Sequence, residues 1–332
     1  MAGSIFRTDI YTLLKAAQRQ GFGVSAAYAG PGESVGTYTA GTGRYGQEFL
    51  VDPDMLFQAG SVSKTAFALT LLRYADRDQL DIDADISDHI SEFVDFPVTF
   101  SALLSHTAGF NVRGFMGYPA KTDPMSLEDV ILGKGNSPKV QRTKPYGEQY
   151  MYSGGGITLA ELAFTRITGK ELRDAFAEEV AGPLELEHTG FFQPLDDDKV
   201  PEAAFGGMLG RLEDPMQGYH YYPEHAAAGL WTTPSELVRI GLEISRSYRN
   251  GGLLSKETAV RMATPVLEDY GLCLIRKGDT AGHTGHNRGF LTYFRFSLTE
   301  DRCAAVMINR SDILIRRLFS KAGESLFNST EE

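Results

Sequence analysis

The sequence predicts an α+β fold, because β-like segments near both ends of the chain flank a long helical stretch. Residues 23–29 and 35–40 have the composition of two strands joined by a turn. Residues 272–275, 290–298 and 303–308 are β-like again near the other end. We expect one antiparallel sheet built from both chain termini, flanked by helices, with a mainly helical region inserted.

Helices are predicted where apolar residues recur on one face and where start or stop signals stand. Residues 1–21 have the pattern of an amphipathic helix, and residues 170–180 and 312–326 predict two more. The apolar run after Gly156 predicts a helix that stops at Gly169. Residues 233–236, Thr-Pro-Ser-Glu, form a capping box with proline at the first helical position.

The same pattern divides the chain into two regions. Residues 1–60 and 216–332 are expected to form the sheet region, and residues 61–215 the mainly helical region. A chain of 332 residues is long enough for about two such units. We expect an active site in the cleft between them.

Composition excludes several classes of function. The net charge of −11 argues against nucleic acid and against anionic membrane surfaces as partners. The two cysteines, Cys273 and Cys303, do not suggest a disulfide framework, and no apolar run approaches transmembrane length. The N-terminus lacks a secretory signal pattern, so we expect a cytoplasmic protein, although a chain already trimmed of its signal would look the same.

The segment Ser61-Val62-Ser63-Lys64 places a hydroxyl and an amine one helical turn apart. The apolar run that follows predicts a buried helix, and burial lowers the pKa of a lysine toward that of a working base. An amine so placed can take the proton of an alcohol that attacks a carbonyl group. The spacing alone is equally compatible with an N-cap serine beside an unrelated lysine.

Two further segments supply what a serine nucleophile needs, namely a proton relay and an oxyanion site. Tyr152-Ser153-Gly154 precedes a predicted helix, and a tyrosine can act as a base beside an ammonium group. His283-Thr284-Gly285 leads through His286 toward the predicted strand at Phe290, and its glycines allow close approach of backbone to a bound acyl group.

With these residues the chain resembles the serine β-lactamase and penicillin-binding protein superfamily. It is most similar to the branch that contains class C β-lactamases, D,D-peptidases, D-amino-acid amidases and esterases of that fold. Five segments carry the resemblance, in the family's order: residues 57–64, 103–110, 152–156, 227–234 and 282–285. Five ordered matches are far more specific than any one of them.

The resemblance implies a β-lactamase-like fold and a two-step acyl transfer without a cofactor or metal. Ser61 would attack an ester or amide carbonyl, while Lys64 and Tyr152 share the proton transfers. The backbone N–H groups of Ser61 and His286 would hold the oxyanion, with His283, Thr284 and Gly285 beside the substrate.

Two positions depart from the family pattern. The second motif usually ends in asparagine, where this chain has Gly154. The third motif usually begins with lysine, where this chain has His283, which is mostly neutral near pH 7. Both changes argue against an efficient β-lactamase or a carboxylate-reading carboxypeptidase, and they favour an esterase or a D-amino-acid amidase.

Several other features have competing interpretations. Gly32-Glu33-Ser34-Val35-Gly36 matches a nucleophile elbow, but a hairpin loop explains it better. Tyr248 is the alternative candidate for the tyrosine role, and His188-Thr189-Gly190 repeats the third motif on an expected loop. Aromatic residues could wall the substrate pocket or simply pack in the core; these are Tyr219, Tyr221, Tyr222, Phe115 and Tyr118.

The sequence therefore predicts a serine hydrolase that cleaves small esters or amides through an acyl-serine intermediate. Two alternatives remain open, an acyltransferase of the same fold and a slowly turning-over penicillin-binding or sensor protein. The acyl group, the leaving group, the stereochemical preference and the oligomeric state are not indicated.

Overall fold

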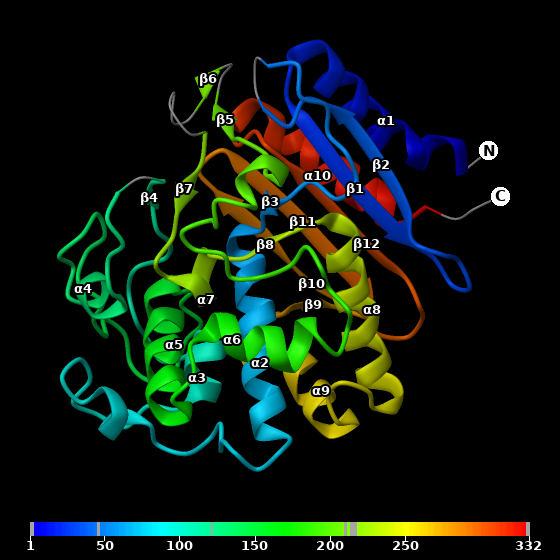
Figure 1. Cartoon of the computed structure of the whole chain (residues 1–332). Coiled ribbons are helices and arrows are strands. Elements are labelled where there is room, and N and C mark those ends of the chain that lie inside the picture. Colours follow the sequence, from blue (N-terminus) through cyan, green and yellow to red (C-terminus); the bar gives the residue numbers. More distant parts are fainter. Residues whose placement is uncertain (1–2, 45–46, 121, 209–210, 213–217, 330–332) are drawn as a thin grey trace.

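The computed structural model describes residues 3–44, 47–120, 122–208, 211–212 and 218–329. Its central feature is a six-stranded antiparallel sheet with the strand order β2-β1-β12-β11-β10-β9 (Figure 1). The strands are β1 (Gly23–Ala29), β2 (Gly36–Gly41), β9 (Ile275–Lys277), β10 (Thr280–Asn287), β11 (Phe290–Ser297) and β12 (Cys303–Ile308). The predicted α+β fold, with one sheet built from both ends of the chain, is confirmed.

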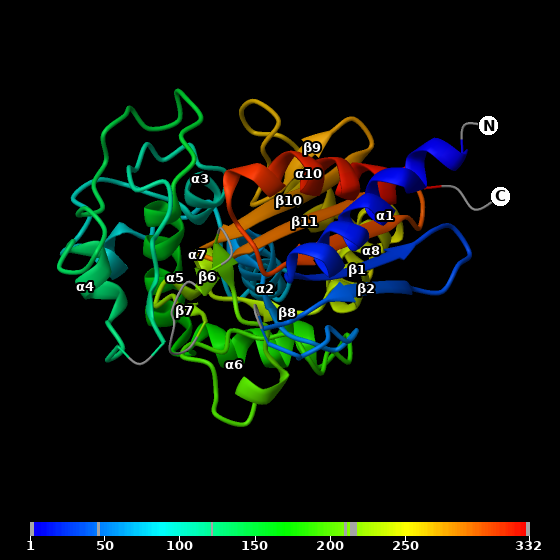
Figure 2. The same cartoon turned by 90° about the horizontal axis from the view of Figure 1, so that it is seen from above.

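Helices cover both faces of this sheet. Helices α1 (Gly3–Gln20) and α10 (Ile313–Phe327) lie together on one face, and α8 (Pro234–Asn250) packs on the other (Figure 2). Strand β12 shows the division, because Ala304 and Val306 face the α1 and α10 side while Ala305 and Met307 belong to the opposite core. This alternation is what a strand buried on both faces requires.

One strand was not predicted as such. The sequence pattern predicts that residues 283–289 lead into a strand at Phe290, whereas β10 runs through Thr280–Asn287 and forms a hairpin with β11. Two glycines and two histidines obscure the strand pattern, because neither residue type favours strands. The pairing places Gly285 opposite Thr292 and His286 opposite Leu291.

The helical part of the chain surrounds α2 (Ser63–Ala75), of which eleven of thirteen residues are buried. Helices α5 (Gly154–Thr168), α6 (Leu172–Phe176) and α7 (His225–Ala228) lie near it (Figure 1). The remaining helices are α3 (Phe100–Leu104), α4 (Leu127–Ile131) and α9 (Lys256–Ala263), with helical turns η1 (Gly60–Val62), η2 (Ser87–Ile90), η3 (Ala177–Ala181) and η4 (Val200–Glu202). Short strand pairs are β3 (Phe57–Gln58) with β8 (Trp231–Thr232), β4 (Tyr118–Pro119) with β7 (His220–Tyr221), and β5 (Gly207–Met208) with β6 (Arg211–Leu212).

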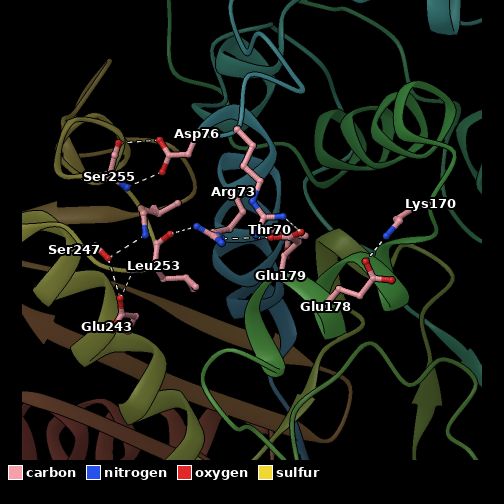
Figure 3. Close-up of polar contacts among 12 residues, drawn as sticks. Thr70, Arg73, Asp76, Lys170, Glu178, Glu179, Glu243, Ser247, Leu253 and Ser255 are labelled. Atoms are coloured by element: carbon pink, nitrogen blue, oxygen red, sulfur yellow. Dashed lines mark hydrogen bonds and ion pairs between the residues drawn. The ribbon is translucent and has the colours of Figure 1, made fainter.

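Polar contacts fix the C-terminal end of α2 on two sides (Figure 3). Asp76 accepts hydrogen bonds from the backbone N of Ser255 at 2.7 Å and from its hydroxyl at 2.8 Å. Arg73 donates to the carbonyl of Leu253, and its Nε lies 3.5 Å from Oε2 of Glu179. The helix is therefore held in a fixed orientation at the end opposite Ser61.

The predicted element boundaries differ from the observed ones by a few residues. The predicted first helix begins at Met1, which lies outside the described residues, as does the predicted regional boundary at residues 215 and 216. The capping box forms only in part: the Thr233 hydroxyl accepts from the backbone N of Glu236, but the Glu236 carboxylate binds the backbone N of His188 instead.

The hairpin interpretation of the Gly-x-Ser-x-Gly segment is confirmed, since β1 and β2 pair antiparallel around it and Gly32 has a φ of +79°. In the described part of the chain, no helix combines the length and the apolar character that spanning a membrane needs. The cellular compartment stays a prediction.

Candidate active site

Ser61 lies in the turn η1, directly before α2. Gly60 makes this turn possible, because its φ of +54° suits glycine and a Cβ there would stand 2.6 Å from the backbone N of His286. One helical turn further on, Lys64 Nζ lies 3.0 Å from Ser61 Oγ and donates to the carbonyl of Ala227 at 2.7 Å. The predicted one-turn separation thus becomes a direct contact between amine and alcohol.

Lys64 is buried, with 2% of its surface exposed. Burial lowers the pKa of Lys64 to about 7, while the neighbouring Cys273 and Glu224 act in the opposite direction. A large fraction of Lys64 is therefore neutral near pH 7, and a neutral amine beside a hydroxyl can accept its proton.

Tyr152 lies just before α5, on a segment held by the cap of that helix. The Ser153 hydroxyl caps α5 by accepting from the backbone N of Gly156 at 2.8 Å. Lys64 Nζ stands 5.2 Å from the centroid of the Tyr152 ring. Burial raises the pKa of Tyr152, and its hydrogen bond with Ser61 only partly opposes that shift. Tyr152 is thus a neutral phenol at ordinary pH, able to pass a proton rather than to begin as a base.

The third motif brings the edge of β10 against the turn that carries Ser61. A Cβ on Gly285 would stand 1.9 Å from the carbonyl oxygen of Ala59, so glycine alone permits this approach. The backbone N of His286 is correspondingly close to Gly60. Backbone N–H groups of the η1 turn and of β10 therefore border the same space in front of Ser61.

His283 does not point a free cation at this space. Its Nε2 lies 3.0 Å from the Tyr270 hydroxyl, and its Nδ1 donates to the carbonyl of Thr284 at 2.7 Å. The Tyr270 hydroxyl also lies 3.2 Å from Nε2 of His106, whose Nδ1 accepts from the backbone N of Ser153 at 3.3 Å.

These partners assign the protons along the hydrogen-bonded row that His106, Tyr270 and His283 form. His106 must carry its proton on Nε2 and donate it to Tyr270, and the tyrosine then donates to Nε2 of His283. Burial lowers the pKa of His283 to about 3 and that of His106 well below its usual value. Both rings are therefore neutral at physiological pH.

A cavity of about 610 Å³ opens in front of Ser61. Its lining includes Ser61, Lys64, Tyr152, Phe115 and the third-motif residues His283, Thr284, Gly285 and His286. Arg113 and Arg316 also line it, whereas none of the described lining residues is an aspartate or a glutamate. The cavity is thus cationic within a protein of net charge −11.

Comparison with known proteins identifies the family. A family model described as Beta-lactamase matches residues 12–314, nearly the whole chain. The chain belongs to the beta-lactamase family.

Several solved structures share the fold at low sequence identity. A D-amino acid amidase from Ochrobactrum anthropi SV3, solved with D-phenylalanine, is 19% identical with a TM-score of 0.78, covering 98% of this chain and 100% of that one. A class C beta-lactamase is 16% identical with a TM-score of 0.77, and the match covers 100% of this chain and 98% of that one. A penicillin-binding protein homologue from Pyrococcus abyssi is 20% identical with a TM-score of 0.71, and the match covers 94% of this chain and 74% of that one.

Among curated sequences, the chain is similar to the teichoic acid D-alanine hydrolase of Staphylococcus aureus. The two are 21% identical over 225 residues, which is 66% of this chain and 51% of the relative. The matched region thus spans about half the length of the curated relative.

Within the beta-lactamase family, the place of the second-motif asparagine is closed here. A Cβ on Gly154 would stand 3.0 Å from Cε2 of Phe115 and 3.3 Å from the carbonyl oxygen of Arg113. The Phe115 ring therefore lies beside the position from which an asparagine side chain would extend. The carbonyl of Ala227 instead receives the hydrogen bond of the lysine.

Four of the five predicted wall aromatics do not line this cavity. Tyr118, Tyr219, Tyr221 and Tyr222 are buried, and of the predicted set only Phe115 belongs to the lining. The Tyr118 and Tyr221 rings pack 5.5 Å apart, and the Tyr221 hydroxyl donates to the carbonyl of Asp123. Their aromatic composition did not distinguish a wall from a core.

Sequence reasoning missed several residues at the site. Arg113, Arg316 and Asn287 line the cavity, and Tyr270 bridges the two histidines. Asn287 donates to Gln58 Oε1 and to the carbonyl of Ala228, which ties β10 to the segment around α7. No local motif marks these positions, because each depends on contacts between distant segments. Among the described residues, no group of three His, Cys, Asp or Glu side chains is arranged to hold a metal ion.

Proposed function

We propose that this protein is a serine hydrolase that cleaves small amides or esters through an acyl-Ser61 intermediate. The observation that carries the proposal is the 3.0 Å contact between Ser61 Oγ and the Nζ of a buried Lys64 at the floor of a cavity. Family membership supports it, since the relatives named above are a D-amino acid amidase, a D-alanine hydrolase and a beta-lactamase.

In the first step, neutral Lys64 accepts the proton of Ser61 as the serine oxygen attacks the carbonyl carbon. The carbonyl of Ala227 then accepts a hydrogen bond from the ammonium that forms. Its position limits the movement of Lys64, so that the amine stays within reach of Ser61 throughout.

Tyr152 passes a proton toward the leaving group. Because burial keeps it a phenol, it can donate its own proton to the departing nitrogen or oxygen and be reprotonated from Lys64. The backbone N–H groups of Ser61 and His286 stabilise the negative oxygen that develops on the substrate. Water then attacks the acyl-enzyme, with the same two side chains returning the proton to Ser61.

We further propose that the cavity lies between a sheet region, residues 1–60 and 216–332, and a helical region, residues 61–215. Lys64 and Tyr152 come from the second region, and Thr284 and Arg316 come from the first. The substrate is proposed to be a small molecule, and a D-aminoacyl amide or ester is the class that the relatives' names favour.

A panel of substrates tests this function. Aryl esters, D- and L-aminoacyl amides and a chromogenic cephalosporin are offered to the wild-type protein and to the Ser61→Ala variant. We expect turnover of at least one ester or amide by the wild type and none above background by the variant. Equal turnover by both proteins would refute the assignment of Ser61.

The same panel distinguishes the alternatives. Added alcohols or amines that appear in the product would identify an acyltransferase. A single burst without sustained turnover would identify a slow penicillin-binding or sensor protein. Hydrolysis that continues at a constant rate supports the hydrolase.

A further inference from the structure

A further buried ionisable group, Glu224, stands at the start of the short helix that holds the proposed catalytic lysine. The short helix α7 packs against α2 and α5, and its Ala227 carbonyl is the acceptor of the Lys64 Nζ. Glu224 is the N-cap residue of this helix, and its backbone carbonyl accepts from the backbone N of Ala227 and of Ala228. The residue that starts the turn therefore also supports the atom that holds Lys64.

The Glu224 side chain is fully buried, with 0% of its surface exposed. No other described residue donates a hydrogen bond to either of its carboxyl oxygens, and the groups that favour its charged form are its own backbone amide and then Lys64. Buried carboxyl groups are normally paired, so a buried carboxyl without a donor requires an explanation.

Glu161 on α5 provides the contrast. It is also buried, but its Oε2 accepts from the backbone N of Ala226 at 2.9 Å, and its Oε1 lies 3.6 Å from Nδ1 of His225. Glu161 thus caps the first turn of α7, a structural role that leaves no orphaned oxygen. Of the two carboxyl groups, Glu224 is the one that raises the pKa of Lys64.

Arg113 and Arg316 line the same cavity as Lys64 and carry positive charge, whereas the other groups that face Lys64 are neutral at physiological pH. They are the thiol of Cys273, the phenol of Tyr152 and the rings of His106 and His283, all with pKa values moved by burial toward the neutral form. Around Glu224 itself, the titratable neighbours include Glu161 and Tyr221, whose pKa values are raised, and His225, whose pKa burial lowers to about 4. Burial raises the pKa of Glu224 to about 7, close to that of Lys64.

We propose that Glu224 is a positioning residue of the reaction, whose buried and unpaired carboxyl, at the start of the turn that holds Lys64, carries a charge that favours the protonated amine and so controls when Lys64 is free to accept the proton of Ser61. The inference rests on the proposed function only for its consequence in turnover. Two groups coupled in this way titrate as a pair.

The test compares Glu224→Gln with the matched control Glu161→Gln. Each variant replaces one buried carboxyl group by an amide and keeps the shape of the side chain. The measurement is kcat/KM for an activated aryl ester between pH 5 and 9. Because a carboxylate favours the charged lysine, its removal lowers the pKa of Lys64, and the acid limb of the profile moves to lower pH by about one unit. Glu161→Gln is expected to leave the limb in place.

A second measurement does not depend on turnover. Lysine side chains labelled with carbon-13 are titrated by NMR in the Ser61→Ala background, with Lys64→Arg to assign the signal. The Lys64 titration should move down by about one unit in Glu224→Gln and stay in place in Glu161→Gln. If Glu224→Gln does not fold, Glu224→Met, of similar length and without charge, takes its place.

The outcomes separate the two proposals. In one outcome, the wild type turns over the ester while Glu224→Gln changes neither the acid limb of its pH profile nor the NMR titration of Lys64. This result overturns the role of Glu224 and leaves the hydrolase proposal intact. An equal shift of the Lys64 titration in both glutamate variants also overturns the role of Glu224, because the effect is then not specific to that residue. A wild type without any turnover contradicts the hydrolase, whereas a shifted Lys64 signal still supports the effect of the Glu224 charge on Lys64.

Discussion

The Tyr270 hydroxyl donates a hydrogen bond to Nε2 of His283 over 3.0 Å. This contact occupies Nε2 of a histidine that lines the cavity, at a position where the family usually has a lysine. A second bond from His106 to the same hydroxyl links the loop that carries Tyr152 to the strand that carries the third motif. The site is thus held together by a neutral hydrogen-bonded row where the family usually has a cation.

Replacing Tyr270 by phenylalanine tests the row. The change leaves two buried ring nitrogens without their partner, so the free energy of unfolding should fall by about 1–3 kcal/mol. Urea denaturation measures the difference. Tyr11→Phe is the control, because Tyr11 is 47% exposed and its loss should change the stability by less than about 0.5 kcal/mol. Equal stability of Tyr270→Phe and the wild type would mean that the row contributes nothing.

The free energy of unfolding should also depend on pH. The pKa of His283 is about 3 in the folded chain, whereas an unfolded histidine titrates near 6.5. Between these values the unfolded chain binds the proton and the folded chain does not, so stability falls as the pH is lowered from 6.5 toward 3, by up to about 1.4 kcal/mol per pH unit for each such group. Denaturation at pH 7, 5 and 4 should show a shallower fall in His283→Asn. A wild-type stability that stays constant over this range would contradict the buried neutral ring.

Tyr152 and Tyr248 are the two candidates for the tyrosine that transfers a proton in the reaction. Tyr152→Phe keeps the ring and removes the group that moves a proton, so kcat should fall by about two to four orders of magnitude. Tyr248 lies in α8 with its ring under Arg276 and outside the cavity lining, and Tyr248→Phe should retain the wild-type kcat. Steady-state kinetics of both variants on one ester decides between the two tyrosines. A kcat that falls in Tyr248→Phe and not in Tyr152→Phe would assign the proton transfer to Tyr248.

Gly154 and Phe115 predict how the site responds to the family's asparagine. Gly154→Asn would push its Cβ against the Phe115 ring, 3.0 Å away, and displace that ring from the cavity wall. We expect kcat/KM to fall between about tenfold and a hundredfold. The double variant with Phe115→Ala should recover part of this loss. A single Gly154→Asn variant of full activity would show that the ring does not limit this space.

Much of the arrangement could be predicted because it depends on neighbours in the sequence. The Ser61 and Lys64 contact follows from one helical turn, and the cap of α5 follows from Ser153 and the glycines after it. The pairing of strands from both termini followed from the two β-like ends of the chain. Ordered family motifs then supplied Tyr152 and the third motif, which no local rule connects to Ser61.

The remainder depends on contacts between distant segments. Tyr270 is 164 residues from His106 along the chain, so no local pattern could pair them. Glu224 has an ordinary place in the sequence, and only its burial beside α2 makes it unusual. Strand β10 escaped notice because the glycines that let it approach Ala59 also weaken its strand pattern.

The most direct test of the central claim, that Ser61 is the nucleophile activated by Lys64, is the mass of the intact protein after brief exposure to a slowly hydrolysed ester. The account predicts one added acyl group, mapped by peptide digestion to Ser61, present in the wild type and absent from Ser61→Ala. Its formation should slow by at least about a hundredfold in Lys64→Met. An acyl group on another residue, or equal labelling of the Ser61→Ala protein, would contradict the account.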